Sequence, residues 1–224
     1  SLFSKELAST SVSSKATQRV LNGENQSPGI SVLNINNIAY WIGKDGAYTT
    51  AGSPNGTMAD YPIFTGGFIY SDGMLWGAKV KGDGLGDEVR VGGSTYNHGL
   101  KAGRIITDAN GAVLGSDDPV NNHVWRVRKD WASADLTVDA ANYYAVGTGD
   151  VSAAQIAVVK NQYEYDWYNW PAAWGAPYHD VNGDGSYDPA VDVPGYPGAD
   201  QTMWTIANDV PLIVDAAGDS IGYS

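Results

Sequence analysis

The acidic residues of one short segment, residues 180–192, have the types and spacing that could bind a metal ion. Asp180, Asn182 and Asp184 stand at its first, third and fifth positions, and Gly185 stands at the sixth. Calcium takes about six to eight oxygen ligands, and side chains at alternate positions converge on one ion only if the backbone coils tightly around it. Glycine suits such a coil because it adopts positive φ without strain. We therefore expect this loop to bind a structural calcium ion.

The expected ligands are spread over the whole loop. They are the side chains of Asp180, Asn182, Asp184 and Asp188, the carbonyl of Ser186, and Asp192, which would ligate directly or through water. An EF-hand has Glu at the twelfth position, whereas Val191 occupies that position here. The segment is therefore similar to the EF-hand-like calcium loops of extracellular proteins. The alternative is a series of Asx turns, in which Asp and Asn bond their own backbone.

Other ionisable residues are weaker candidates for a site. An acidic group in an expected hairpin loop is either a second ion site or, as we favour, simply solvated; it consists of Asp83, Asp87 and Glu88. The histidines lack the paired spacing that zinc sites use; they are His98, His123 and His179.

A glycosidase cleft uses two carboxylates that flank a sugar, and the acids Glu164 and Asp166 lie among aromatic residues. Positions two apart point to different sides of a strand or a helix, which disfavours a shared site. No nucleophile-elbow, phosphate-loop or dinucleotide motif is present. We expect no catalytic residue and no cofactor-binding residue, and hence a protein that is not an enzyme.

Composition limits the binding partners and the cellular location that can be expected for this 224-residue chain, which carries a formal charge of −12. Such a charge repels nucleic acid and anionic membrane surfaces. Cysteine is absent, so disulfides and thiolate metal sites are excluded. No apolar run approaches the about 18 residues of a spanning helix, so membrane insertion is not expected. An extracellular or cell-surface protein whose signal peptide has been removed fits these features.

Turn dipeptides recur along the chain and separate short strand-like runs, as in all-β proteins. The runs are 35–42, 63–70, 74–81, 88–96, 101–107, 123–129 and one or two more within 202–213. The clearest hairpin joins 75–80 to 88–92. Ser152 and Gln155 resemble a capping box, which predicts one helix that ends near Tyr165.

The expected fold is mainly β, an irregular β-sandwich-like domain with one short helix and long loops. Residues 1–32 are too polar to form a core, so we expect an extended N-terminal arm or linker that docks on another chain or on a sheet edge, followed by a calcium-binding domain over 33–224. The chain ends on Gly-Tyr-Ser, which suggests a fragment of a longer protein.

Residues 166–178 bring three tryptophans together with two prolines, and we expect irregular structure there. Burial of these rings would indicate a scaffold, whereas exposure in an open groove would indicate a ligand site. The tryptophans are Trp167, Trp170 and Trp174.

A resemblance rests on several segments that occur in a fixed order. They are NNI at 36–38, GMLWGAKV at 73–80, EVRV at 88–91, WPAAWGAPYHDVNGDGSYDP at 170–189, GADQTMW at 198–204 and Asn208-Asp209. Together they resemble the N-terminal region of large uncharacterised secreted proteins of Bacteroidetes-related bacteria, which often end in a type IX secretion sorting domain. The resemblance implies export and calcium binding but no activity, and this sequence lacks the sorting tail.

Two functions from different classes follow as hypotheses. The first is a calcium-stabilised structural or adhesive module, such as a subunit of a surface layer or filament, with self-association or other surface proteins as its partners. The second is a carbohydrate-binding module or a glycosidase-associated fragment. The eight tryptophans are the reason for this hypothesis, and the partner would be a glycan. An inert spacer in a large exported protein is the third reading.

Overall fold

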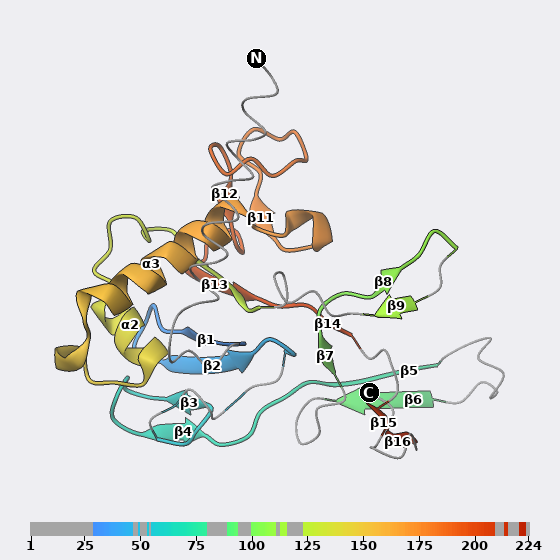
Figure 1. The fold of residues 1–224 in the computed structure, drawn as a ribbon, viewed down its shortest axis with the longest axis horizontal. Coiled ribbons are helices and arrows are strands. Elements are labelled where there is room, and N and C mark those ends of the chain that lie inside the picture. The colour runs from blue at the N-terminus through green and yellow to red at the C-terminus, as the bar shows by residue number, and fades with distance from the viewer. Residues whose placement is uncertain are drawn as a thin grey trace.

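The computed structural model describes residues 29–46, 49, 53, 55–79, 89–93, 100–110, 113–115, 123–208, 213–214 and 220–222. Within these ranges all strand pairings are antiparallel, and the strands are accompanied by two α-helices (Figure 1). The mainly β class is therefore confirmed. In the same ranges, no helix combines the length and apolar character needed to cross a membrane.

One four-stranded sheet has the order β1-β2-β3-β4, with strands Ile30–Leu33, Ala39–Gly43, Ala59–Asp60 and Gly67–Ile69. Val32 pairs with Trp41, and both are fully buried. Burial alternates along β2, as the period of two of a strand requires. The predicted run 35–42 is wrong in its first half, because residues 34–38 connect β1 to β2. Residues 30–32, assigned to the arm by the sequence, belong to β1.

The remaining strands form two-stranded pairs. These are β5 (Leu75–Lys79) with β6 (Val89–Gly93), β7 (Lys101–Ala102) with β14 (Ala207–Asn208), β8 (Ile106–Thr107) with β9 (Val113–Gly115), β10 (Trp125–Arg128) with β13 (Gln201–Trp204), β11 (Tyr178–His179) with β12 (Val193–Pro194), and β15 (Ile213–Val214) with β16 (Ser220–Gly222). The β5–β6 pair confirms the predicted hairpin. The predicted run 101–107 instead divides into strands of two different sheets.

The longer helix, α3 (Ala153–Tyr168), begins at the predicted capping box. The Gln155 amide donates to Ser152 Oγ at 3.2 Å, and the Ser152 amide donates to Gln155 Oε1 at 2.8 Å. The helix runs to Tyr168, beyond the expected end, and a 3₁₀ turn, η2 (Ala172–Trp174), follows it. The expectation of irregular structure from residue 166 was therefore wrong in part.

A second α-helix, α2 (Thr137–Tyr144), corrects the expectation of one helix, and a 3₁₀ turn, η1 (Thr148–Asp150), follows it. The β-branched Thr137 and Val138 at its start favour strands, which hides the helix in the sequence. Leu136 and Ala140 pack there against Val159 and Tyr163 of α3. Tertiary packing thus outweighs local propensity in this segment.

The helices, β10 and β1 surround one interior region. Helix α3 packs against α2 and β10, and β1 contacts both α2 and β13. Figure 1 shows α2 and α3 on one side of the β1–β2 pair, with the β5–β6 hairpin at the lower right, away from the helices. A second apolar cluster, around Trp125, Tyr165 and Trp170, lies where α3 ends and supports the loop that carries the candidate metal ligands.

Candidate metal centre

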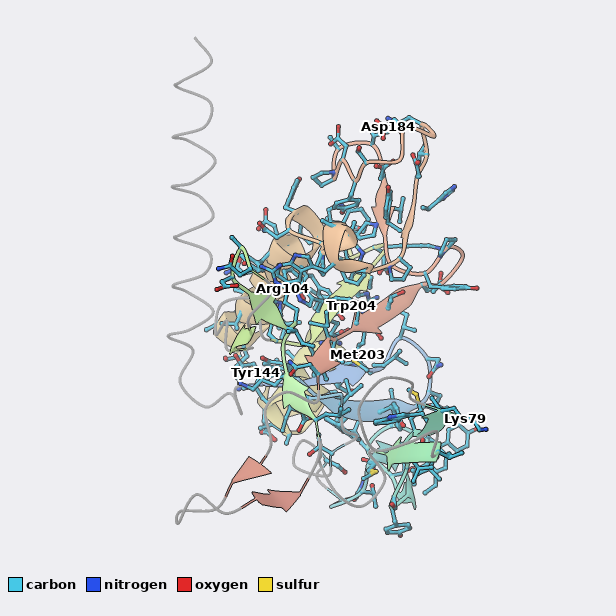
Figure 2. The ribbon with its side chains drawn as sticks, turned by 90° about the vertical axis from the view of Figure 1, so that its right-hand side faces the viewer. Lys79, Arg104, Tyr144, Asp184, Met203 and Trp204 are labelled. Atoms are coloured by element: carbon cyan, nitrogen blue, oxygen red, sulfur yellow. The ribbon has the colours of Figure 1, made fainter. Side chains whose placement is uncertain are left out.

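The acidic loop, residues 180–192, spans the connection between β11 and β12. His179 pairs with Val193 and Tyr178 pairs with Pro194, so the two ends of the loop are held side by side. The loop projects from the body of the protein, as Figures 1 and 2 show from two directions, and Asp184 lies near its outer end. All six expected ligands therefore lie on one closed loop.

The first half of the loop coils through hydrogen bonds between its own side chains and backbone. Asp180 Oδ1 accepts from the Gly183 amide at 2.7 Å, and its Oδ2 accepts from the Gly185 amide at 2.8 Å. Asp184 Oδ1 accepts from the Ser186 amide at 2.8 Å. Both glycines have positive φ, 74° and 76°, as the tight coil requires. These amide bonds, that of Gly185 foremost, lower the pKa of Asp180.

The second half of the loop is closed by a buried carboxylate. Asp192 is 2% exposed and accepts from the Val181 amide at 2.9 Å and from the Asp188 amide at 2.8 Å. Asp188 Oδ1 in turn accepts from the Ala190 amide at 2.9 Å. Asp192 thus ties the end of the loop back to its beginning, a role that the sequence alone did not indicate.

The loop fits calcium in the kind and order of its donors, although its oxygens are not gathered into a cage. Among the described residues, no group of three or more His, Cys, Asp or Glu side chains is placed to hold a metal ion. Asn182 Nδ2 donates to Asp184 Oδ2 at 2.8 Å, a bond that ligation by both side chains would replace. Asp180 Oδ1 accepts two amides, whereas the other bonded carboxylate oxygens of the loop each accept one hydrogen bond and keep a second lone pair. The Asx turns and a calcium site are therefore compatible, and calcium remains a prediction.

Aromatic residues attach the loop to the end of α3. The Tyr187 hydroxyl donates to the Trp167 carbonyl at 2.6 Å, and Trp167 Nε1 donates to the Pro189 carbonyl at 3.2 Å. Burial, followed by the charges of Asp192 and Asp188, raises the pKa of Tyr187, so its hydroxyl stays protonated as a donor. These two hydrogen bonds connect the loop to the last turn of the helix.

No protein-family model, curated protein or solved structure matches this chain. The resemblance to exported bacterial proteins accordingly stays an expectation.

The burial of the three tryptophans was expected to distinguish a scaffold from a ligand site. Two of them belong to the apolar cluster, and one lines a cleft. Trp170 is buried with Trp125 and Tyr165, and its Nε1 donates to the Pro177 carbonyl at 2.8 Å. Trp174 packs against the same cluster, and the guanidinium of Arg104 lies 4.7 Å from the centre of its ring. Trp167 is half-buried and lines a cleft beside the acidic loop.

Of the other candidates, Asp166 has a partner that the sequence did not reveal. Asp166 is fully buried, and its Oδ1 lies 2.8 Å from His123 Nε2, while its Oδ2 accepts from the Arg126 amide at 2.7 Å. Burial raises the pKa of Asp166, although His123 and the hydrogen bonds oppose this effect. Glu164 is exposed, so the two acids form no shared site. The acidic group 83, 87 and 88 and His98 lie outside the described residues.

A buried ionic network was also not predicted from the sequence. Asp139 bonds Arg126 through Oδ1 and Arg128 through Oδ2, the latter at 2.6 Å, and the Tyr163 hydroxyl donates to Asp139 Oδ1 at 2.6 Å. Gln201 Nε2 donates to that hydroxyl at 2.7 Å. The network joins β10, α2, α3 and β13 around charges that are almost entirely removed from water, so its role is structural.

Proposed function

We propose that this chain is an extracellular structural or adhesive module, sandwich-like in its β architecture, that is stabilised by calcium and associates with further copies of itself, as a subunit of a surface layer or filament does. It is not an enzyme in this proposal, because its sequence carries no catalytic motif. One observation carries the association: the apolar face of the β5–β6 hairpin.

That face carries three apolar side chains, Leu75, Val89 and Val91, and the exposed Lys79 lies at its end opposite Val89. The register pairs Leu75 with Gly93, Gly77 with Val91 and Lys79 with Val89, so these three side chains lie on the same side of the hairpin. Leu75 is 80% exposed and Val91 is 81% exposed. Large apolar side chains gathered on one exposed surface mark a contact site, and a lone two-stranded hairpin is marginally stable in water. A second copy that packs on this face would cover the exposed apolar side chains and would also stabilise the hairpin.

The acidic loop supports the extracellular setting. Calcium loops of extracellular modules have dissociation constants of about 10⁻⁴ to 10⁻³ M, weaker than those of cytosolic buffers and sensors, so such a site would be filled outside the cell and empty in the cytosol. The loop is bonded to α3 through Tyr187 and Trp167, so bound calcium would stabilise the body of the domain and not the loop alone.

The test compares Leu75→Asp/Val91→Asp with the wild type by light scattering over a concentration series. Both side chains are exposed, so the substitutions should leave the fold intact, which circular dichroism verifies. We expect the wild type to associate more strongly as salt rises, because salt screens the charge of −12 on each copy, and the variant to stay monomeric. Val138→Asp, a matched change at an exposed valine of α2, should associate like the wild type. A wild type that remains monomeric at all concentrations contradicts the proposal.

A further inference from the structure

A cleft of about 460 Å³ lies at the base of the acidic loop. Its walls include Lys129 after β10, Trp167 of α3, His179 of β11, Val193 of β12, and the turn that carries Tyr196 and Pro197. Sites for small ligands have volumes of about 300 to 1,000 Å³ and combine apolar walls with a few polar groups. This cleft has both properties.

Two aromatic side chains provide its apolar walls, and both belong to backbone that is held in place. The Trp167 indole is fixed by its bond to the Pro189 carbonyl. Tyr196 is 68% exposed, but its amide donates to Thr202 Oγ1 at 2.9 Å. The preceding Gly195 has a φ of 98°, and a Cβ there would come within 2.7 Å of the same Oγ1. The turn is therefore a tight one that presents Tyr196 to solvent at the rim of the cleft.

The basic side chains that line the cleft are Lys129 and His179, and each has a carboxylate beside it that lies outside the lining. Lys129 Nζ lies 3.7 Å from a carboxylate oxygen of Asp200, and His179 directly precedes Asp180. An anionic ligand would meet these carboxylates as well as the cations, on a chain whose net charge is −12. A purely apolar ligand would leave the ammonium and the imidazole without new partners. A neutral ligand with hydroxyl groups and an apolar C–H face satisfies both the aromatic walls and the polar groups.

We infer that this cleft binds a neutral oligosaccharide, one or two sugar units at a time, with the Trp167 indole and the Tyr196 ring against the sugar faces. The hydroxyl groups of the sugar would bond Lys129 and His179. This binding goes beyond the structural role proposed for the chain, and a module that holds a glycan at this point would be attached to a polysaccharide surface.

Two residues that line the cleft, His179 and Val193, directly flank the acidic loop. His179 and Val193 pair with each other, and all of the loop lies between them. Ordering of the loop by calcium would therefore hold one wall of the cleft in place and strengthen saccharide binding. This dependence on calcium, unlike the cleft itself, rests on the proposed calcium site.

The experiment titrates the wild-type protein, in calcium and in EDTA, with neutral hexasaccharides of glucose, mannose, xylose and N-acetylglucosamine, and follows tryptophan fluorescence and calorimetric heat. We expect at least one hexasaccharide to bind with a Kd below about 1 mM. Trp167→Ala and Tyr196→Ala should each weaken binding at least about tenfold. Phe68→Ala removes an exposed aromatic ring of β4 that does not line the cleft, and this variant should bind like the wild type.

The outcomes separate the cleft from the calcium site. No binding by any hexasaccharide in calcium, or binding that Trp167→Ala and Tyr196→Ala leave unchanged, overturns the cleft even if calcium raises the melting temperature. Preferential binding of a charged polysaccharide, polygalacturonate, also overturns it. Equal affinity in calcium and in EDTA overturns the coupling to the loop and leaves the saccharide site standing.

Discussion

Asp180 and Asp192 stand at the two ends of the same loop but in different surroundings. Asp180 accepts three backbone amides on the outer coil, and those bonds favour its charged form. Asp192 is buried at the base and closes the loop. Asp184 lies between them at the exposed end, where its removal costs the fold least. The three acids would therefore respond differently to substitution.

The prediction for Asp184→Ala concerns calcium dependence. Saturating the wild type with about 5 mM calcium should raise the free energy of unfolding by about 1 to 2 kcal/mol, for a site with a Kd of about 10⁻⁴ to 10⁻³ M. The variant should lose this gain while its stability in EDTA stays close to that of the wild type. Thermal melting in calcium and in EDTA measures both quantities.

Asp150→Ala, a change at an exposed acid of η1 outside the loop, is the control and should keep the calcium dependence. If wild-type melting curves in calcium and EDTA superimpose, the loop is a series of Asx turns without an ion.

A second prediction at the residue scale concerns Asp166 and pH. Because its pKa is raised by burial, the folded state holds this proton more tightly than the unfolded chain. Its contribution to stability is then fully present below the usual value of 3.8 and is lost as pH rises through the folded pKa. The difference in unfolding free energy, wild type minus Asp166→Asn, should therefore fall from acidic to neutral pH. Urea denaturation at several pH values measures it, and a difference that rises with pH would reverse the assignment.

At the scale of elements, local signals are strongest where a hydrogen-bonding pattern closes within one turn. The capping box of α3 is such a pattern. The hairpin β5–β6 has a longer connection but joins strands that are consecutive in the chain. Helix α2 has no side-chain cap bond at its N-cap residue, Leu136, although the Asp135 carboxylate accepts from the Thr137 amide at 2.9 Å. Helix α2 depends on packing against α3, which explains why it could not be predicted from the local sequence.

Ser152→Ala should destabilise the protein by about 1 kcal/mol, because it removes the acceptor for the Gln155 amide at the start of α3. Urea denaturation provides the measurement. Ser133→Ala, in an exposed turn whose hydroxyl makes only a 3.4 Å contact with the Asp130 carbonyl, should cost less than about 0.5 kcal/mol. Equal losses in the two variants would mean that the capping box contributes nothing beyond an ordinary surface serine.

For the molecule as a whole, the decisive contacts join residues that are far apart in the chain. Arg126 Nη2 donates to Asn34 Oδ1 at 2.7 Å across 92 positions, and Gln201 Oε1 accepts from the Asn34 amide across 167 positions. These bonds connect the first sheet to β10 and β13. The buried charge of Asp139 lies at the centre of the same network.

Removing that charge should affect global stability far more than removing an exposed one. Asp139→Ala leaves Arg126 and Arg128 without their shared carboxylate, a loss expected to cost about 3 to 5 kcal/mol. Asp130 also pairs with Arg128, at 2.7 Å, but its side chain is 54% exposed, so Asp130→Ala should cost less than about 1 kcal/mol. Chemical denaturation of both variants checks the contrast, and equal costs would show that burial does not decide the strength of this network.

The sequence by itself determined the features whose contacts close within a few residues. The coil from Asp180 to Ser186 and the capping box at Ser152 were recognisable, because backbone geometry alone restricts which residues meet over such short spans. The β5–β6 hairpin was recognisable because its strands are consecutive in the chain. The mainly β class followed from the same turn signals. The ionic network and the pairing of His123 with Asp166 were not recognisable from the sequence, since they join residues that only the complete fold brings together.

Tertiary structure also decided between residues of one type. Trp167 and Trp170 are three positions apart at the end of α3, yet Trp170 enters the core and Trp167 lines the cleft. Trp167 stands between Asp166 and Tyr168, and Trp170 stands between Asn169 and Pro171, but these neighbours do not decide which ring is buried. The burial of each ring depends on where β10 and the acidic loop pack against the end of the helix, and that packing is a property of the whole chain.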